Sequence, residues 1–132
     1  MATGRPRQLH ATAVYLEDHA TEIPTEVYHK VADETMDKIF DNLEALVEGD
    51  ENLDSEFSSG VLTLVTPGGT YVINKQPPNK QIWLSSPLSG PKRYDWVSEA
   101  REWVYSRDGS TLRGLLKEEV GLEYGDVGGE RS

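Results

Sequence analysis

The chain has 132 residues and a formal net charge of −10. It contains no cysteine, which excludes disulfide scaffolds, thiolate zinc sites, cysteine-ligated iron–sulfur clusters and thiol nucleophiles. A single domain of this length can bury a sizeable core, its apolar runs are too short for a membrane helix, and its negative charge opposes binding to nucleic acid.

The negative charge is unevenly distributed along the chain. Residues 26–56 hold eleven acidic and two basic side chains, whereas the rest of the chain is close to neutral. A uniformly acidic surface would only favour solubility. The concentration of charge in one quarter of the chain therefore indicates a cationic partner.

The first 24 residues show neither helical nor strand periodicity, and Gly4 and Pro6 interrupt them. They predict a flexible N-terminal segment over residues 1–24. Arg5 and Arg7 precede every acidic residue, as in an organelle-targeting segment, but the stretch is too short to assign from composition.

An amphipathic helix is predicted from Glu26 to Glu48, which contains no glycine or proline and has apolar residues at a 3.6-residue period. Thr25 is the expected N-cap, and Gly49 is the expected stop. The face opposite the apolar stripe is nearly all carboxylate. Each like-charged pair at i,i+4 spacing destabilises the helix by about 0.2–0.5 kcal/mol, so this face is a modest stability liability.

Beyond residue 53 the apolar period changes to two, which predicts strands. The expected strands are 53–58, 60–65, 70–76, 80–85, 93–96 and 102–106. The segments between them are short and rich in proline and glycine, including a loop over residues 87–91. Because parallel neighbours need long crossovers, these connections predict an antiparallel meander.

A second amphipathic helix is predicted after Asp108–Ser110, with Gly121 as a left-handed C-terminal cap. Residues 123–132 contain three glycines and few apolar residues, which predicts a flexible C-terminal tail. The sequence therefore predicts one α+β domain over residues 25–122. Its architecture is a two-layer sandwich with both helices on one face of an antiparallel sheet of about six strands.

Strand alternation separates a helix-facing row from an open-face row. If Ile73 and Ile82 face the helices, the open face carries Asn74, Gln76, Gln81 and Trp83. An exposed tryptophan among neutral amides, with Lys80, Lys92 and Arg93 nearby, has the composition of a protein interface. The alternative is that Trp83 lies against a loop as peripheral core.

The central block of the chain, residues 69–96, reads GTYVINKQPPNKQIWLSSPLSGPKRYDW and resembles the frataxin family almost residue for residue. The similarity extends from about Tyr28 to Val120 and includes the acidic helix, Ser59–Leu64 and Trp103–Gly109. Two departures stand out. Residues 97–102 form a longer turn, and the C-terminal tail is shorter than in animal members, where it covers the groove between the helices. The short tail predicts a less protected groove.

The resemblance implies a mitochondrial matrix protein that activates the cysteine desulfurase and scaffold complex of iron–sulfur cluster assembly and donates iron to it. Ferredoxin and ferrochelatase are implied as further partners. Iron, as Fe2+ or Fe3+, is expected to bind weakly to surface carboxylates, and the expected state is a monomer that forms iron-dependent oligomers. The alternative is an iron-storage ferroxidase that acts through metal-driven oligomers.

The site residues follow from the same resemblance. The partner-binding residues are Asn74, Gln76, Gln81, Trp83 and Arg93. The metal-binding residues, called the acidic ridge below, are Asp33, Glu34, Asp37, Asp41, Glu44, Glu48, Asp54 and Glu56. One helix face cannot surround an ion, so weak and partly hydrated binding is expected. The competing interpretations are an ordinary solvated helix face for the ridge and, for His29, a bystander rather than a ligand beside Asp33.

Conventional catalysis has little support in the sequence. All three histidines precede residue 30, so no Ser-His-Asp set is apparent in the predicted sheet. No phosphate-binding loop or dinucleotide fingerprint is present. A non-catalytic activator is therefore the expected role, with ferroxidase activity implied only by the family.

Overall fold

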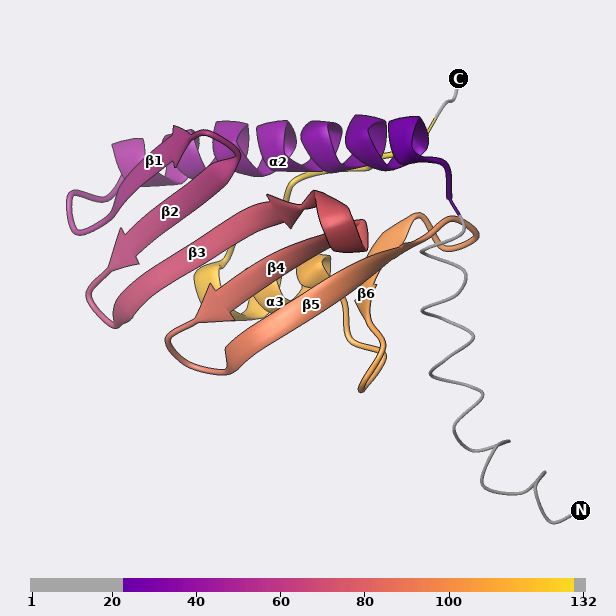
Figure 1. The fold of residues 1–132 in the computed structure, drawn as a ribbon. Helices are drawn as coiled ribbons and strands as arrows, with labels where there is room; N and C mark the ends of the chain where they lie inside the picture. The colour runs from indigo at the N-terminus through magenta and orange to yellow at the C-terminus, as the bar shows by residue number, and fades with distance from the viewer. Residues whose placement is uncertain (1–22, 130–132) are drawn as a thin grey trace, which may run out of the picture.

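Two helices cover one face of a six-stranded antiparallel sheet (Figure 1). This computed structural model describes residues 23–129, and the predictions for residues 1–22 and 130–132 lie outside them. The elements are α2 (Thr25–Glu48), β1 (Asp54–Ser58), β2 (Val61–Thr66), β3 (Gly69–Gln76), η1 (Pro77–Asn79), β4 (Gln81–Ser86), β5 (Gly90–Val97), β6 (Glu102–Tyr105) and α3 (Leu112–Val120). Within the described residues, no helix is both long and apolar enough to cross a membrane. The predicted α+β two-layer sandwich is confirmed.

The strands follow one another in space in chain order, β1-β2-β3-β4-β5-β6, as the predicted meander requires. β5 differs from its prediction because it begins at Gly90 rather than at residue 93, so Gly90 and Pro91 of the predicted loop belong to the strand and only residues 87–89 connect it to β4. β6 pairs only with Tyr94 to Val97, which leaves the start of β5 with one neighbouring strand. Proline is compatible with a strand there, and Pro91 lies in that part of β5.

The core lies between the helices and the sheet. From α2 it contains Tyr28, Val31, Ala32, Met36, Ile39 and Leu43, and from the sheet it contains Leu62, Leu64, Tyr71, Ile73, Ile82, Leu84, Tyr94, Trp96 and Trp103. Thr35 is the polar member of the helical stripe. Its hydroxyl donates to Val31 O at 2.7 Å and accepts from Trp103 Nε1 at 2.9 Å, so the group is satisfied inside the core. Trp96 and Trp103 are at most 2 % exposed, so both tryptophans are part of the core packing.

The helix ends depart from prediction at one position. Pro24, not Thr25, is the N-cap of α2, and it makes no side-chain capping bond. Thr111 is the N-cap of α3, and its side-chain oxygen accepts from Gly114 N at 2.9 Å. It ends at Gly121 in the left-handed conformation, as predicted, with φ 77°.

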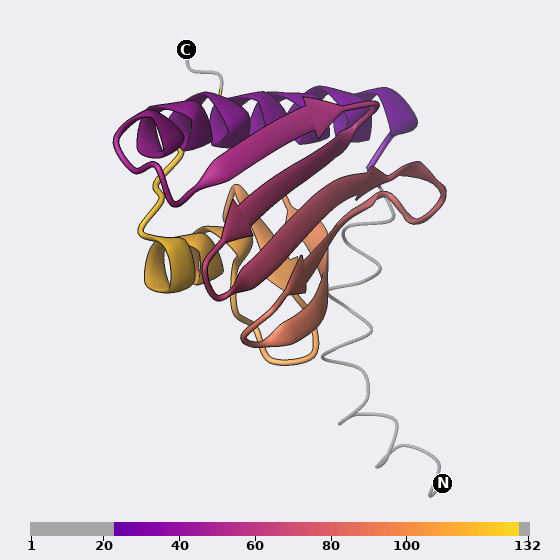
Figure 2. The ribbon, with the colours of Figure 1, turned by 90° about the vertical axis from the view of Figure 1, so that its left-hand side faces the viewer.

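The C-terminal segment, residues 121–129, is packed on the domain, so the predicted flexible tail is wrong over residues 123–129. Leu122, Tyr124 and Val127 are each at most 2 % exposed. The segment leaves α3 and runs beside α2 in both views (Figures 1 and 2). Gly128 N donates to Glu34 Oε1 at 3.2 Å on α2. The groove that we expected to be poorly protected is therefore covered.

Two features of the segment explain why composition was misleading. Its glycines allow backbone turns and a close approach, since a Cβ at Gly128 would lie 2.6 Å from the Trp96 ring. Arg113 of α3 holds the segment by donating to Gly125 O at 2.9 Å and by placing its guanidinium 4.4 Å from the centre of the Tyr124 ring. A few well-placed anchors thus replace a continuous apolar pattern.

The N-terminal boundary also moves. Ile23 was assigned to the flexible segment, but it is only 8 % exposed and belongs to the core. Its carbonyl accepts from Lys80 Nζ at 2.8 Å. Among the residues that the structure describes, the core therefore begins at Ile23, before α2, and extends to Val127.

Candidate functional site

The open face of the sheet carries a straight row of side chains from neighbouring strands. Cross-strand register pairs Val61 with Asn74, Asn74 with Trp83, and Trp83 with Arg93. The second amide pair, Gln76 and Gln81, lies directly beside this row. All five residues predicted for partner binding, Asn74, Gln76, Gln81, Trp83 and Arg93, therefore share one face. Trp83 is partly exposed, whereas Ile82 beside it is buried.

The indole of Trp83 is held by its neighbours on the open face. Its Nε1–H donates to Gln81 Oε1 at 2.7 Å, and the Arg93 guanidinium lies 5.5 Å from the centre of its ring. Gln81 Nε2 in turn donates to Asp95 Oδ1 at 3.0 Å. Sequence reasoning missed Asp95, although alternation along β5 puts it on the same face as Arg93.

The ends of β3 and β4 that carry the two glutamines are fixed from the helix side. The Tyr28 hydroxyl of α2 donates to Gln81 O at 2.7 Å and accepts from Gln76 N at 3.1 Å. Burial raises the pKa of Tyr28 to about 12, so the hydroxyl remains a donor at physiological pH. Tyr28 therefore links the acidic helix directly to the backbone of the open-face residues.

A hollow of about 370 Å³ lies beside Trp83. Its lining residues are Val72, Asn74, Trp83, Leu84, Ser85, Pro91, Lys92 and Arg93. Lys92 lines the hollow without placing its charge there, because it pairs in register with the buried Leu84 and its ammonium donates to Ser89 O at 2.8 Å on the α3 side of the sheet. The floor is mainly apolar, and Arg93 is the cation at the rim. Such a hollow can receive a side chain of the partner next to the indole. Side chains that fill a pocket in this way are typical of the centre of a protein interface.

The acidic ridge lies along the outer side of α2 and on β1. Seven of its eight members are exposed, and Glu34 is partly exposed. Phe40 and Phe57, whose ring centres are 5.3 Å apart, pack β1 against α2. Asp54 and Glu56 alternate with Phe57 along β1 and pair in register with Val65 and Thr63, so they lie on the open face of this edge strand rather than on the side that packs against α2. The metal-binding role of the eight residues stays a prediction.

Two ridge carboxylates already have partners within the protein. Asp33 Oδ1 lies 2.7 Å from Lys75 Nζ of β3, and His29 Nδ1 lies 3.0 Å from the same ammonium. Glu34 pairs with Lys38 at 3.8 Å and also accepts from Gly128 N. The ammonium of Lys75 therefore occupies the place at which His29 and Asp33 would share a metal ion.

Within residues 23–129, no group of three or more histidine, aspartate or glutamate side chains is arranged to hold a metal ion. Asp37, Asp41, Glu44 and Glu48 instead project along one exposed helix side. Neighbouring positions on a helix surface are about 5–6 Å apart between Cβ atoms, which favours one or two carboxylates per ion with water completing the shell. This arrangement offers a negative surface rather than a preformed cage.

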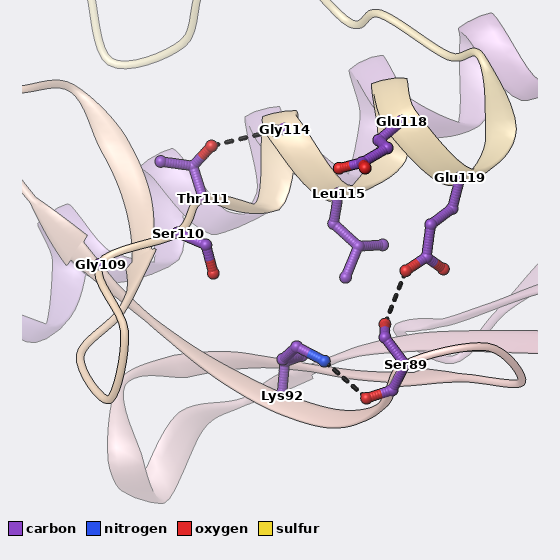
Figure 3. A pocket seen from close by; sticks show the side chains of 9 residues that line it. All are labelled: Ser89, Lys92, Gly109, Ser110, Thr111, Gly114, Leu115, Glu118 and Glu119. Atoms are coloured by element: carbon purple, nitrogen blue, oxygen red, sulfur yellow. Dashed lines mark hydrogen bonds between the residues drawn. The ribbon is translucent and has the colours of Figure 1, made fainter.

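A second concavity, of about 460 Å³, lies between the start of α3 and the β4–β5 hairpin (Figure 3). Its main polar group is Glu119, which accepts from Ser89 at 2.6 Å, from Ser86 at 2.7 Å and from Tyr71 at 3.0 Å. Partial burial raises the pKa of Glu119, but these hydrogen bonds outweigh it and hold the pKa below its ordinary value. This carboxylate joins the hairpin to α3, a role with no signal in the sequence pattern.

The fold and the two surfaces together define a class of protein: a two-layer α+β sandwich with an acidic helix and, on the open side of its sheet, a polar face centred on tryptophan. The sequence profile of the frataxin-like domain matches residues 21–126. The chain belongs to the frataxin family.

Individual relatives agree with this assignment. The mitochondrial frataxin homolog of Saccharomyces cerevisiae is 54 % identical over 101 residues, which cover 74 % of this chain and 57 % of that protein. Mitochondrial frataxin of Arabidopsis thaliana is 41 % identical over 108 residues, which cover 78 % of this chain and 57 % of the relative. The chain thus spans a little over half the length of these curated relatives. It is a mitochondrial member of the family.

Solved structures give the same result for the fold. Yeast frataxin, described as trimeric and complexed with ferrous iron, superimposes with a TM-score of 0.63 and is 49 % identical. The match covers 75 % of this chain and 96 % of that structure.

Proposed function

We propose that this protein is a mitochondrial matrix activator of iron–sulfur cluster assembly that binds the cysteine desulfurase and scaffold complex through its open sheet face. One observation carries the proposal: Asn74, Trp83 and Arg93 stand in register across three strands, with the indole held in place and a hollow beside it. A rigid aromatic anchor among amides and an arginine is the usual centre of a protein interface.

The charge of this face adds a preference for partner chemistry. Arg93 stands at the rim of the hollow, whereas the acidic ridge lies along α2 and β1. The surface docked on the sheet face is therefore expected to be neutral or acidic, and the surface facing the ridge is expected to be basic. A partner complex that has both kinds of surface would be oriented by the electrostatic fields of the sheet face and the acidic ridge.

In this proposal iron is cargo that binds to the acidic ridge, and it is not a resident cofactor. On α2 the available oxygen ligands are Asp37, Asp41, Glu44 and Glu48, because Asp33 and Glu34 are engaged with Lys75, Lys38 and the C-terminal segment. Asp54 and Glu56 of β1 are the two further exposed members of the ridge. Hard carboxylate oxygens suit ferrous and ferric ions, and their spacing favours weak, hydrated binding that permits release. The yeast frataxin described as complexed with ferrous iron supports this part of the proposal.

A second candidate function is an iron-storing ferroxidase that works through metal-driven oligomers. The trimeric state of yeast frataxin favours it, since a trimer can bring ridges of different copies together and complete an iron shell that one helix leaves open. The two candidates differ in whether a monomer without iron has any activity.

The deciding experiment measures cysteine desulfurase turnover on the scaffold complex with equimolar protein and a chelator present. The variants are wild type, Trp83→Ala and the ridge double variant Asp37→Asn/Asp41→Asn. Stimulation by the iron-free wild-type monomer, lost in Trp83→Ala, supports the activator. Activity confined to iron-loaded oligomers, unaffected by Trp83→Ala, would overturn it in favour of storage.

A further inference from the structure

Two consecutive hydrogen bonds on the open face connect a buried carboxyl group to the partly exposed indole. Asp95 Oδ1 accepts from Gln81 Nε2 at 3.0 Å, and Gln81 Oε1 accepts from Trp83 Nε1 at 2.7 Å. Asp95 is only 1 % exposed although it lies on the open face, whereas Gln81 and Trp83 are partly exposed. The two hydrogen bonds therefore link a buried residue, Asp95, to a residue that a partner can contact, Trp83.

The polarity of the two ends permits only one orientation of the glutamine amide. The indole N–H can only donate, so it requires the amide oxygen of Gln81. The carboxyl oxygen of Asp95 accepts, so it requires the amide NH2. A flipped Gln81 amide would place its NH2 against the indole donor and its oxygen against the carboxyl oxygen. Asp95 thus selects the amide orientation that Trp83 needs.

We infer that Asp95 is a positioning residue for the partner surface: it acts through Gln81 to hold the Trp83 indole in one orientation, and this inference rests on the proposed function of that face. The Arg93 guanidinium lies 5.5 Å from the centre of the Trp83 ring and supports the same orientation through a cation–π contact. An anchor that is already ordered loses less side-chain entropy on binding. Asp95 itself need not touch the partner.

The arrangement also limits what Trp83 can offer. Its only polar donor, the indole N–H, is bonded to Gln81 within the protein. A partner therefore contacts the apolar surface of the ring beside the hollow. Specificity then comes from shape around the ring and from polar groups nearby. A partner acceptor aimed at the indole nitrogen would have to displace Gln81.

The first test uses nuclear magnetic resonance on the full chain and needs no partner. Asp95→Leu removes the acceptor with little change in size, and Asp95→Asn keeps an oxygen that can accept from Gln81. The Trp83 indole N–H resonance is assigned by its loss in Trp83→Phe. In Asp95→Leu this resonance is expected to move upfield and its proton to exchange faster with solvent. In Asp95→Asn it is expected to stay near its wild-type position. An unmoved indole resonance in a folded Asp95→Leu would overturn the inference.

A measurement on the wild type covers the case in which Asp95→Leu does not fold. One of the two Gln81 side-chain amide protons is bonded to Asp95 Oδ1, so it is expected to exchange more slowly than the other. Equal and fast exchange of both protons would show that Asp95 does not hold the amide.

The second test adds the cysteine desulfurase and scaffold complex as the probe. Because one hydrogen bond is lost, Asp95→Leu is expected to raise the concentration for half-maximal stimulation roughly 3- to 10-fold. Maximal stimulation at saturation is expected to stay at the wild-type level, because the contact surface itself is intact. Asp95→Asn is expected to behave like wild type.

The outcomes separate the two proposals. If Trp83→Ala stimulates as well as wild type, the proposed function of the face is wrong whatever Asp95 does. If Trp83→Ala fails but Asp95→Leu matches wild type in both the indole resonance and half-maximal concentration, the face is correct and the positioning role of Asp95 is wrong.

Discussion

Lys75 Nζ lies 2.7 Å from Asp33 Oδ1, so an ion pair joins the central strand β3 to the acidic helix α2. The lysine side chain is 18 % exposed and the aspartate side chain is 60 % exposed. The acidic ridge is therefore not uniform. Asp33 has a structural partner, whereas Asp37 and Asp41, one and two turns further along the same side, project into solvent.

The first prediction separates these two kinds of carboxylate. Asp33→Asn is expected to lower the free energy of unfolding by up to about 1 kcal/mol, because Lys75 loses its partner and the aspartate side of the pair is largely exposed. Asp37→Asn removes two like-charge pairs at i,i+4 spacing and is expected to raise that free energy by about 0.2–0.5 kcal/mol for each pair. Urea denaturation at low salt measures both. Stabilisation by Asp33→Asn would contradict the role assigned to Lys75.

The second prediction compares neighbours on opposite faces of β4. Ile82→Ala is expected to cost about 2–5 kcal/mol, because Ile82 is fully buried beneath the helices. Trp83→Ala is expected to cost about 1 kcal/mol or less, since the ring is partly exposed and gives up one hydrogen bond. Thermal unfolding and desulfurase stimulation are measured on both. Equal destabilisation would mean that the indole belongs to the core.

The third prediction concerns the C-terminal segment. Deletion of residues 123–132 removes Tyr124 and Val127 from the core and is expected to lower the free energy of unfolding by at least about 3 kcal/mol. Val27→Ala on the exposed side of α2 is the control and is expected to stay within about 0.5 kcal/mol of wild type. A deletion variant as stable as wild type would show that the segment contributes nothing to the core.

The fourth prediction is a pH dependence centred on Glu119. Because the hydrogen bonds from Ser86, Ser89 and Tyr71 outweigh burial, the pKa of Glu119 is lower in the folded protein than its ordinary value of 4.5. Its contribution to stability is fully present above that ordinary value and is lost as the pH falls through the folded pKa. The stability advantage of wild type over Glu119→Gln is therefore expected to shrink below about pH 4.5.

Denaturation curves from pH 3.5 to 7 test this, with Glu118→Gln on the exposed side of α3 as the matched control. An advantage that stays constant with pH in the Glu119→Gln comparison would mean that the hydrogen bonds do not favour the charged carboxylate.

The layers and the strand order were accessible from the sequence because local rules agree with the global fold. The 3.6-residue stripe of α2 and the period-two strands each assign one side to the core, and short turns leave only an antiparallel meander. The same alternation placed Trp83 opposite Ile82, which is why the open-face residues were predicted correctly.

What could not be predicted depends on contacts between distant residues. Lys75 and Asp33 are 42 positions apart, and Asp95 meets Gln81 only through strand register. The buried C-terminal segment has no periodicity, because its anchors Tyr124 and Val127 are placed by Arg113 and by a close approach at Gly128. Composition alone cannot distinguish such a segment from a disordered tail.

Completion of the core by Tyr124 and Val127 has a consequence for the order in which the protein folds. Gly128, next to Val127, donates to Glu34 of α2, which lies 94 positions earlier, so α2 gains its full set of contacts only after the segment beyond α3 has been made. We expect nascent chains to stay protease-sensitive until that segment is available. Chains stalled on ribosomes with C-terminal linkers of graded length would become protease-resistant only once Val127 clears the exit tunnel; resistance at shorter linkers would contradict this order of events.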